Sequence, residues 1–86
     1  MKPFIQEGDC VACVVKDRIL FISGNKDYYL TKQQLALIEI SVMHLRGKEV
    51  VNLRVIDVCG PGNVFYFPNY ESARKVFDYL IEFRDS

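Results

Sequence analysis

The sequence has no tryptophan, a single histidine, only three cysteines and no net charge over its 86 residues. Eleven acidic residues balance eleven basic ones, so the chain creates no long-range field that would attract a phosphate backbone. We therefore expect no nucleic-acid partner. The longest apolar run, residues 10–15, is six residues long, against the roughly 20 that a membrane-spanning helix needs. We expect no membrane span either.

The beginning of the sequence lacks the features of a secretory signal. Residues 1–5 are followed at once by Gln6 and Glu7, which leaves no apolar segment of the required length. Three cysteines are an odd number and form no disulfide framework, so we expect a protein of the reducing cytoplasm. Half of the residues are hydrophobic and 13% are aromatic, which is enough for one core, and we expect one domain over residues 1–86.

The clearest pattern in the sequence is an amphipathic helix over residues 68–84. Its apolar residues fall within one arc of roughly 160° at 100° per residue: Tyr70, Ala73, Val76, Phe77, Leu80, Ile81 and Phe83. The charged residues fall on the other side, and Tyr79 lies near the middle of that polar side. Asn69 is the expected N-cap because its side-chain oxygen can accept from the first turn. A helix with one apolar side needs a surface to cover.

The residues before this helix read as strands separated by turns. We expect strands over residues 9–16, 19–22, 28–30, 50–58 and 64–67, with Phe4 and Ile5 as an additional edge strand. Lys16 and Asp17 form the first expected turn, residues 23–27 a loop, and residues 60–63 (Gly-Pro-Gly-Asn) a type II turn. The expected fold class is α+β and mostly β, with six or seven antiparallel strands in a curved sheet or partial barrel capped by one C-terminal helix.

The segment of residues 31–46 allows two interpretations. Thr31 and Gln34 are spaced as in a helical capping box, and Gly47 would suit a helix C-terminus. In helical spacing, however, Lys32, Glu39 and Arg46 would divide the apolar face with charge. In a strand, Ile38, Ile40 and Val42 face one side and Glu39 and Ser41 the other. We favour a tight turn at residues 31–34 followed by a strand to about Leu45.

The order of these elements from Arg18 onward resembles the bacterial pleckstrin-homology-like (PH-like) domains. The resemblance lies in Asp27-Tyr28-Tyr29-Leu30, the turn before Ile38-Glu39-Ile40, the long strand of residues 50–58, and Phe65-Tyr66-Phe67-Pro68-Asn69 leading into the helix. It implies a curved antiparallel β structure capped by the C-terminal helix, and it raises phospholipid headgroups as ligands. Lys16-Asp17-Arg18 holds only two positive charges around a negative one, so lipid binding is a weaker alternative.

The cysteines are the main candidates for metal or redox chemistry. Two residues separate Cys10 from Cys13, and Cys59 and His44 would complete a four-ligand zinc site. In a strand, however, residues i and i+3 point to opposite faces, and no glycine bends the chain between the two cysteines. We favour separate buried thiols and expect no cofactor. A zinc- or thiol-dependent module using Cys10, Cys13 and Cys59 is the alternative.

No pair of carboxylates and no serine, histidine and aspartate set stands out, so we expect a protein that is not an enzyme. The expected function is that of a protein-binding adaptor or inhibitor, with self-assembly into a homo-oligomer as one form of it. The small size and the lack of a catalytic set would suit an inhibitor encoded by a phage or another mobile element. Exposed tyrosines are favoured at interfaces, and we select Tyr79 and the adjacent Tyr28 and Tyr29, of which one must point outward.

Overall fold

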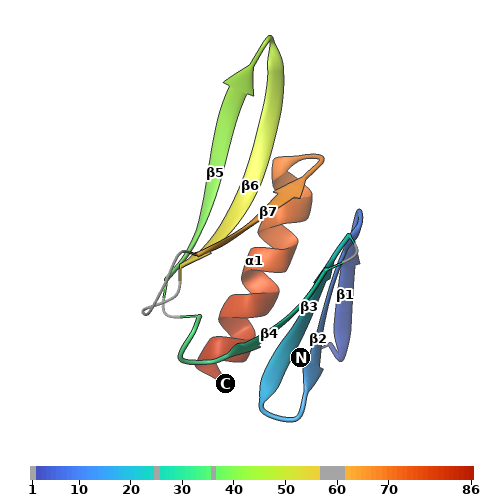
Figure 1. Cartoon of the computed structure of the whole chain (residues 1–86), viewed down its shortest axis with the longest axis vertical. Helices are drawn as coiled ribbons and strands as arrows, with labels where there is room; N and C mark the ends of the chain where they lie inside the picture. Colours follow the sequence, from blue (N-terminus) through green and yellow to red (C-terminus); the bar gives the residue numbers. More distant parts are fainter. Residues whose placement is uncertain (1, 25, 36, 57–61) are drawn as a thin grey trace.

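A computed structural model describes residues 2–24, 26–35, 37–56 and 62–86. Within these residues it contains seven strands and one helix: β1 (Phe4–Glu7), β2 (Cys10–Val15), β3 (Arg18–Ser23), β4 (Lys26–Thr31), β5 (Leu37–Leu45), β6 (Lys48–Ile56), β7 (Asn63–Phe67) and α1 (Tyr70–Asp85). The strands form two antiparallel sheets, β1-β2-β3-β4 and β5-β6-β7 (Figure 1). The expected mostly β fold with one C-terminal helix is confirmed. The sheets do not close into a barrel.

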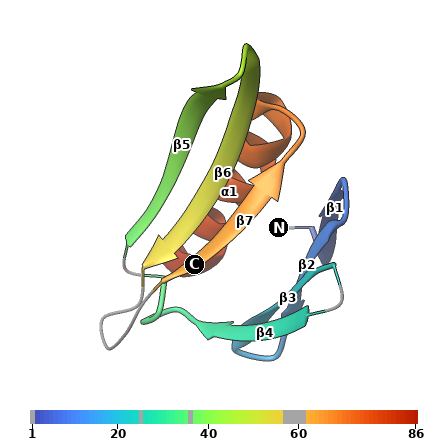
Figure 2. The ribbon, with the colours of Figure 1, turned by 45° about the horizontal axis from the view of Figure 1, so that its top comes forward.

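Helix α1 begins where its sequence indicates. Asn69 is extended, with φ −156° and ψ 168°, and its side chain accepts a hydrogen bond from the amide of Ser72, as expected of an N-cap. The helix covers one face of β5-β6-β7 and also contacts β1 (Figures 1 and 2). It buries Ala73, Val76, Tyr79, Leu80 and Phe83. The helix therefore lies between the two sheets and is covered on more than one side.

The segment of residues 31–46 is a turn and a strand, as favoured from its alternation. The amide of Thr31 donates to Oε1 of Gln34 at 2.9 Å, and the amide of Gln34 donates to Oγ1 of Thr31 at 3.3 Å. This is the reciprocal exchange of a capping box, but here it closes a single turn. In β5, Glu39 points away from the helix and pairs with Arg54 of β6 at 3.2 Å. The strand thus keeps the charge of Glu39 outside the core, whereas a helix would place it within the apolar face.

Short turns join β1 to β2, β2 to β3 and β5 to β6. The expected turn at Lys16 and Asp17 joins β2 to β3, and Lys16 adopts a φ of 59°. Arg46 and Gly47 join β5 to β6 with φ values of 52° and 76°, the positive pair that a type I′ hairpin turn requires. The loop at residues 23–27 is shorter than expected because β3 includes Ser23 and β4 begins at Lys26. In the expected turn at residues 60–63, Gly60 and Pro61 lie outside the described residues.

An aromatic cluster joins the two sheets. The rings of Phe21 in β3 and Phe65 in β7 lie 4.1 Å apart between centroids, and Tyr28 in β4 meets Phe65 edge-on at 5.3 Å. Such tilted and edge-on arrangements are favoured between aromatic rings. The core formed around them takes buried residues from both sheets and from the helix. The two sheets and the helix therefore share one core.

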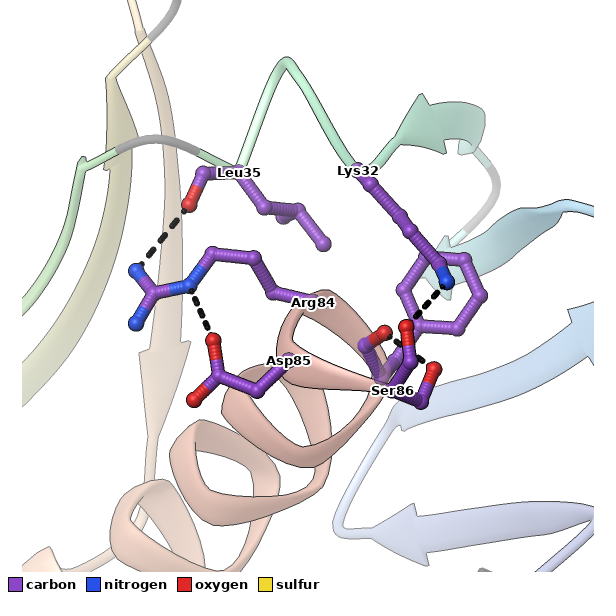
Figure 3. Close-up of polar contacts among 6 residues, drawn as sticks. Lys32, Leu35, Arg84, Asp85 and Ser86 are labelled. Atoms are coloured by element: carbon purple, nitrogen blue, oxygen red, sulfur yellow. Dashed lines mark hydrogen bonds and ion pairs between the residues drawn. The ribbon is translucent and has the colours of Figure 1, made fainter.

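The connection between β4 and β5 is anchored to the C-terminal end of the helix (Figure 3). Nζ of Lys32 donates to the carbonyl oxygen of Ser86 at 2.7 Å and also lies 5.4 Å from the centroid of the Phe83 ring. Arg84 donates to the carbonyl oxygen of Leu35 at 3.3 Å, and the side chain of Leu35 is fully buried. Cations at a helix C-terminus are stabilising because the last carbonyl groups carry partial negative charge.

Candidate protein-interaction surface

The three-stranded sheet has one face on the helix and one face away from it. The strand register places Leu37 opposite Ile56, Glu39 opposite Arg54, and Asn52 between Ser41 and Tyr66. These residues share one face because side chains alternate along a strand. The other face supplies the core with Ile38, Val51, Leu53, Val55, Phe65 and Phe67. We call the face away from the helix the outer face.

The outer face carries a concentration of exposed apolar side chains. Ten large hydrophobic residues are exposed in the described part of the chain, and five of them lie here: Leu37, Met43, Leu45, Val64 and Tyr66. Half-buried Val50 and Ile56 of β6 lie between them on the same face. An antiparallel sheet with one solvated face normally alternates between apolar inward and polar outward residues. Here seven of the twelve outward positions are apolar as well, which is typical of a surface that another molecule covers.

The charges near the centre of the outer face balance each other, and Lys48 lies at its far end, opposite Leu45. Glu39 and Arg54 are each about half exposed and form an ion pair at 3.2 Å, so neither offers an uncompensated charge to a ligand. At the centre, Asn52 is 6% exposed, and its Oδ1 atom has no hydrogen-bond partner among the described residues. The face therefore suits an apolar, uncharged surface better than a polyanion.

Tyr66 is the most exposed large hydrophobic residue in the described part of the chain, at 69%. We did not select it from the sequence, because residues 64–67 are all apolar and the run gives no local polarity to orient them. Phe65 and Phe67 are buried on either side of it. Side chains alternate between the two faces of a strand, so taking Phe67, the residue before Pro68, as buried would have placed Tyr66 on the outer face.

Of the neighbouring tyrosines, Tyr29 points outward and Tyr28 does not, which confirms that one of the two must be exposed. Tyr28 is half-buried against Phe65, whereas Tyr29 is 57% exposed. Tyr29 lines a shallow cavity of about 360 Å³ together with residues 15–18. Asp17 and Arg18 form an exposed ion pair at 4.0 Å at that cavity. This pairing reduces the positive charge that the turn could offer to a lipid phosphate.

The expected exposure of Tyr79 is wrong. Its side chain is 5% exposed, and its hydroxyl donates to the carbonyl oxygen of Lys2 at 2.9 Å. Burial raises the pKa of Tyr79 above its ordinary value of 10.0. The cause of the error is β1, which lies beside the helix on the side that looked polar (Figure 1). The buried arc is rotated by about 60° from the expected one, and Tyr70 is exposed instead.

An open groove of about 570 Å³ runs between β1 and the helix, with Tyr79 in its wall. Lys75 reaches across from the helix to Glu7 of β1, with 3.7 Å between Nζ and Oε1. The hydroxyl of Tyr79 makes the second link between the helix and the start of the chain. The two links hold the walls of the groove together, so Tyr79 makes a structural contact that was not expected from the sequence.

The candidate metal ligands do not come together. Cys10 is buried and Cys13 is half-buried, as free thiols three positions apart on β2, and His44 is exposed near the end of β5 in the other sheet. Cys59 lies outside the described residues. Among the described residues, no three histidine, cysteine, aspartate or glutamate side chains are placed to hold a metal ion. Burial raises the pKa of Cys10 to about 12, so this thiol stays protonated at neutral pH.

The helix of the described chain is too short and too polar to cross a bilayer. Comparisons with protein-family models, with curated proteins and with solved structures give no match.

Proposed function

We propose that this chain is a non-enzymatic protein-binding module, a small cytoplasmic adaptor or inhibitor, which binds a protein partner through the outer face of β5-β6-β7. The single observation that carries the proposal is the exposed apolar character of that face. Its five exposed hydrophobic residues lie on β5 and β7, and the half-buried Val50 and Ile56 of β6 lie between these two strands on the same face. Removing such an apolar surface from water lowers the free energy, and this is the main favourable term in protein association.

The chemistry of the face indicates the kind of partner. The Glu39–Arg54 pair is internally balanced, and the other residues near the centre of the face are apolar or uncharged. The matching surface is a folded protein with an apolar, uncharged centre. Tyr66 is the proposed anchor, because tyrosine supplies a large contact area with few rotatable bonds. Tyr29 is a second exposed tyrosine on the other sheet, whereas Tyr28 and Tyr79 contribute to the core.

The PH-like architecture and the cytoplasmic location belong to the same proposal. Four antiparallel strands, then three, then a terminal helix that covers the second sheet support a PH-like arrangement. The free thiols of Cys10 and Cys13 support a reducing compartment. The neutral, buried thiol of Cys10 supports a structural role over a redox one.

The test is the affinity for a purified partner. The partner is captured from the source organism with the tagged chain, produced separately, and titrated by calorimetry with wild type, Tyr66→Ser and Tyr29→Ser. A central aromatic anchor is worth at least about 2 kcal/mol, so Tyr66→Ser should weaken binding by at least about thirtyfold. Tyr29→Ser is the matched control, since it also removes an exposed tyrosine ring from a strand, and should change affinity less than about threefold.

Two results would contradict the proposal. If Tyr29→Ser weakened binding and Tyr66→Ser did not, the site would lie at the turn of residues 15–18 on the other sheet. If the purified protein held stoichiometric zinc and had no titratable thiols, the zinc- or thiol-dependent alternative would replace it. Binding to vesicles that contain anionic phospholipid, lost on Arg18→Ala, would favour the lipid alternative.

A further inference from the structure

Strand β5 forms a free edge of the three-stranded sheet. It is nine residues long and pairs only with β6 among the described strands, whereas the other three edge strands, β1, β4 and β7, have four, six and five residues. Residues 37–45 contain no proline, glycine, lysine or arginine, and Glu39 is the one acidic residue. Native proteins usually protect edge strands with such residues or by covering them. This edge is long, apolar and unprotected.

The hairpin geometry decides which backbone groups point outward from this edge. The two-residue turn at Arg46 and Gly47 makes Leu45 and Lys48 the closing hydrogen-bonded pair of the β5–β6 ladder. Hydrogen-bonded and non-bonded pairs alternate along an antiparallel ladder. Residues 38, 40, 42 and 44 therefore direct their amide and carbonyl groups away from β6. These four residues are available to a further strand.

We propose that a second copy of this chain pairs with β5 along this edge, antiparallel and about a two-fold axis that passes through Ser41. In this register Ile40 lies opposite Val42 of the second copy, and Ile38 lies opposite its His44. All four outward pairs then form, which gives about eight backbone hydrogen bonds at two per pair. The three-stranded sheets of the two copies then become one sheet of six strands.

The side chains of β5 are complementary to themselves in this register. Leu37 and Leu45 are 51% and 53% exposed in the single chain, and each lies opposite the other across the axis. Glu39 faces Met43, so no two like charges lie directly opposite, which would be destabilising. A centre at a neighbouring residue would leave one end of the strand unpaired. The axis at Ser41 is the one that pairs all nine residues.

This inference concerns the edge of the sheet and goes beyond the proposed function, which concerns its outer face. Pairing at the edge leaves the outer faces open and places two of them side by side, so the dimer could bind a partner with two sites more tightly than one chain does. Pairing through one strand from each chain buries less surface than a permanent interface does. We therefore expect a reversible, concentration-dependent dimer.

The experiment is sedimentation equilibrium of the full chain at increasing concentration, with variants at Ser41. Wild type should pass from monomer to dimer. Ser41→Lys and Ser41→Glu should each remain monomeric, because two like charges meet at the axis. Their equimolar mixture should form the heterodimer, which a misfolded variant would not do. The control is Val64→Lys on β7, the opposite edge of the same sheet, which should dimerise as wild type does.

Backbone-amide hydrogen exchange gives a second readout in the same samples. The amides of Ile38, Ile40, Val42 and His44 should exchange more slowly as the concentration rises, whereas those of the intervening residues already bond to β6 and should not change. A wild-type chain that stays monomeric throughout the series, or a charge-swapped mixture that stays monomeric, would overturn the inference. If Val64→Lys abolished the dimer, the contact between the two copies would lie at β7 and not at β5. Partner binding that depends on Tyr66 in a monomeric chain would leave the proposed function standing alone.

Discussion

Tyr79 makes two separable contributions to the stability of the fold, one through its ring and one through its hydroxyl. Tyr79→Phe keeps the buried ring and removes only the hydrogen bond to the carbonyl oxygen of Lys2, which is 2.9 Å long. The net value of such a bond is about 1 kcal/mol, and Lys2 is exposed, so water can replace the lost donor. We expect the free energy of unfolding to fall by about 0.5–1 kcal/mol.

Tyr79→Ala removes the ring as well and should cost about 3 kcal/mol, the usual value for truncation of a buried aromatic side chain. Urea denaturation measures both variants, and an unchanged m-value shows that the difference lies in stability. The controls are Tyr29→Phe and Tyr29→Ala, since Tyr29 is 57% exposed and should lose less than about 1 kcal/mol in either variant. If Tyr79→Ala cost no more than Tyr29→Ala, the helix would not lie against β1.

Three further predictions follow from buried or capping groups. Burial raises the pKa of Cys10 from 9.0 to about 12, so above pH 9 the folded chain keeps a proton that the unfolded chain loses. The free energy of unfolding should therefore fall as the pH rises above 9, by up to about 1.4 kcal/mol per pH unit. Cys10→Ala should flatten that fall, which urea titrations at several alkaline pH values measure. Asn52→Leu removes a buried oxygen that has no hydrogen-bond partner among the described residues, so it should increase the free energy of unfolding by about 1 kcal/mol and raise the thermal midpoint. A lower midpoint would mean that the Asn52 amide makes hydrogen bonds in the folded chain. Asn69→Ala removes the acceptor of the Ser72 amide at 2.8 Å and should cost about 1 kcal/mol in urea denaturation, while Asn69→Asp should cost less; equal losses would contradict the capping role.

The sequence predicted those elements whose pattern is local. Asn69 and the period of the helix located α1, and the alternation from Ile38 to Val42 identified β5 against a competing capping-box signal. The exchange between Thr31 and Gln34 forms as the capping-box spacing suggests, yet the chain does not continue as a helix. Placing the charge of Glu39 outside the core decided between the two, which is a tertiary effect that local propensity does not contain.

The candidate site was less predictable, because exposure depends on contacts between distant segments. A helical wheel places Tyr79 on the polar side, and only the contact of α1 with β1, some 70 residues earlier in the chain, buries it. Tyr66 was missed for the opposite reason, since an unbroken apolar run does not show which residues face the helix. Of the residues selected from the sequence, Tyr29 keeps the exposure that a partner contact needs.

The most direct test of the account is a map of the surface that changes when the purified partner binds. Chemical shifts of backbone amides, recorded for the chain alone and in the complex, identify that surface. The account predicts that the changes concentrate on the outer face of β5-β6-β7, with Tyr66, Val64 and Leu37 among the most affected. Changes confined to the turn beside Tyr29 or to the groove between β1 and α1, with the outer face unaltered, would contradict it.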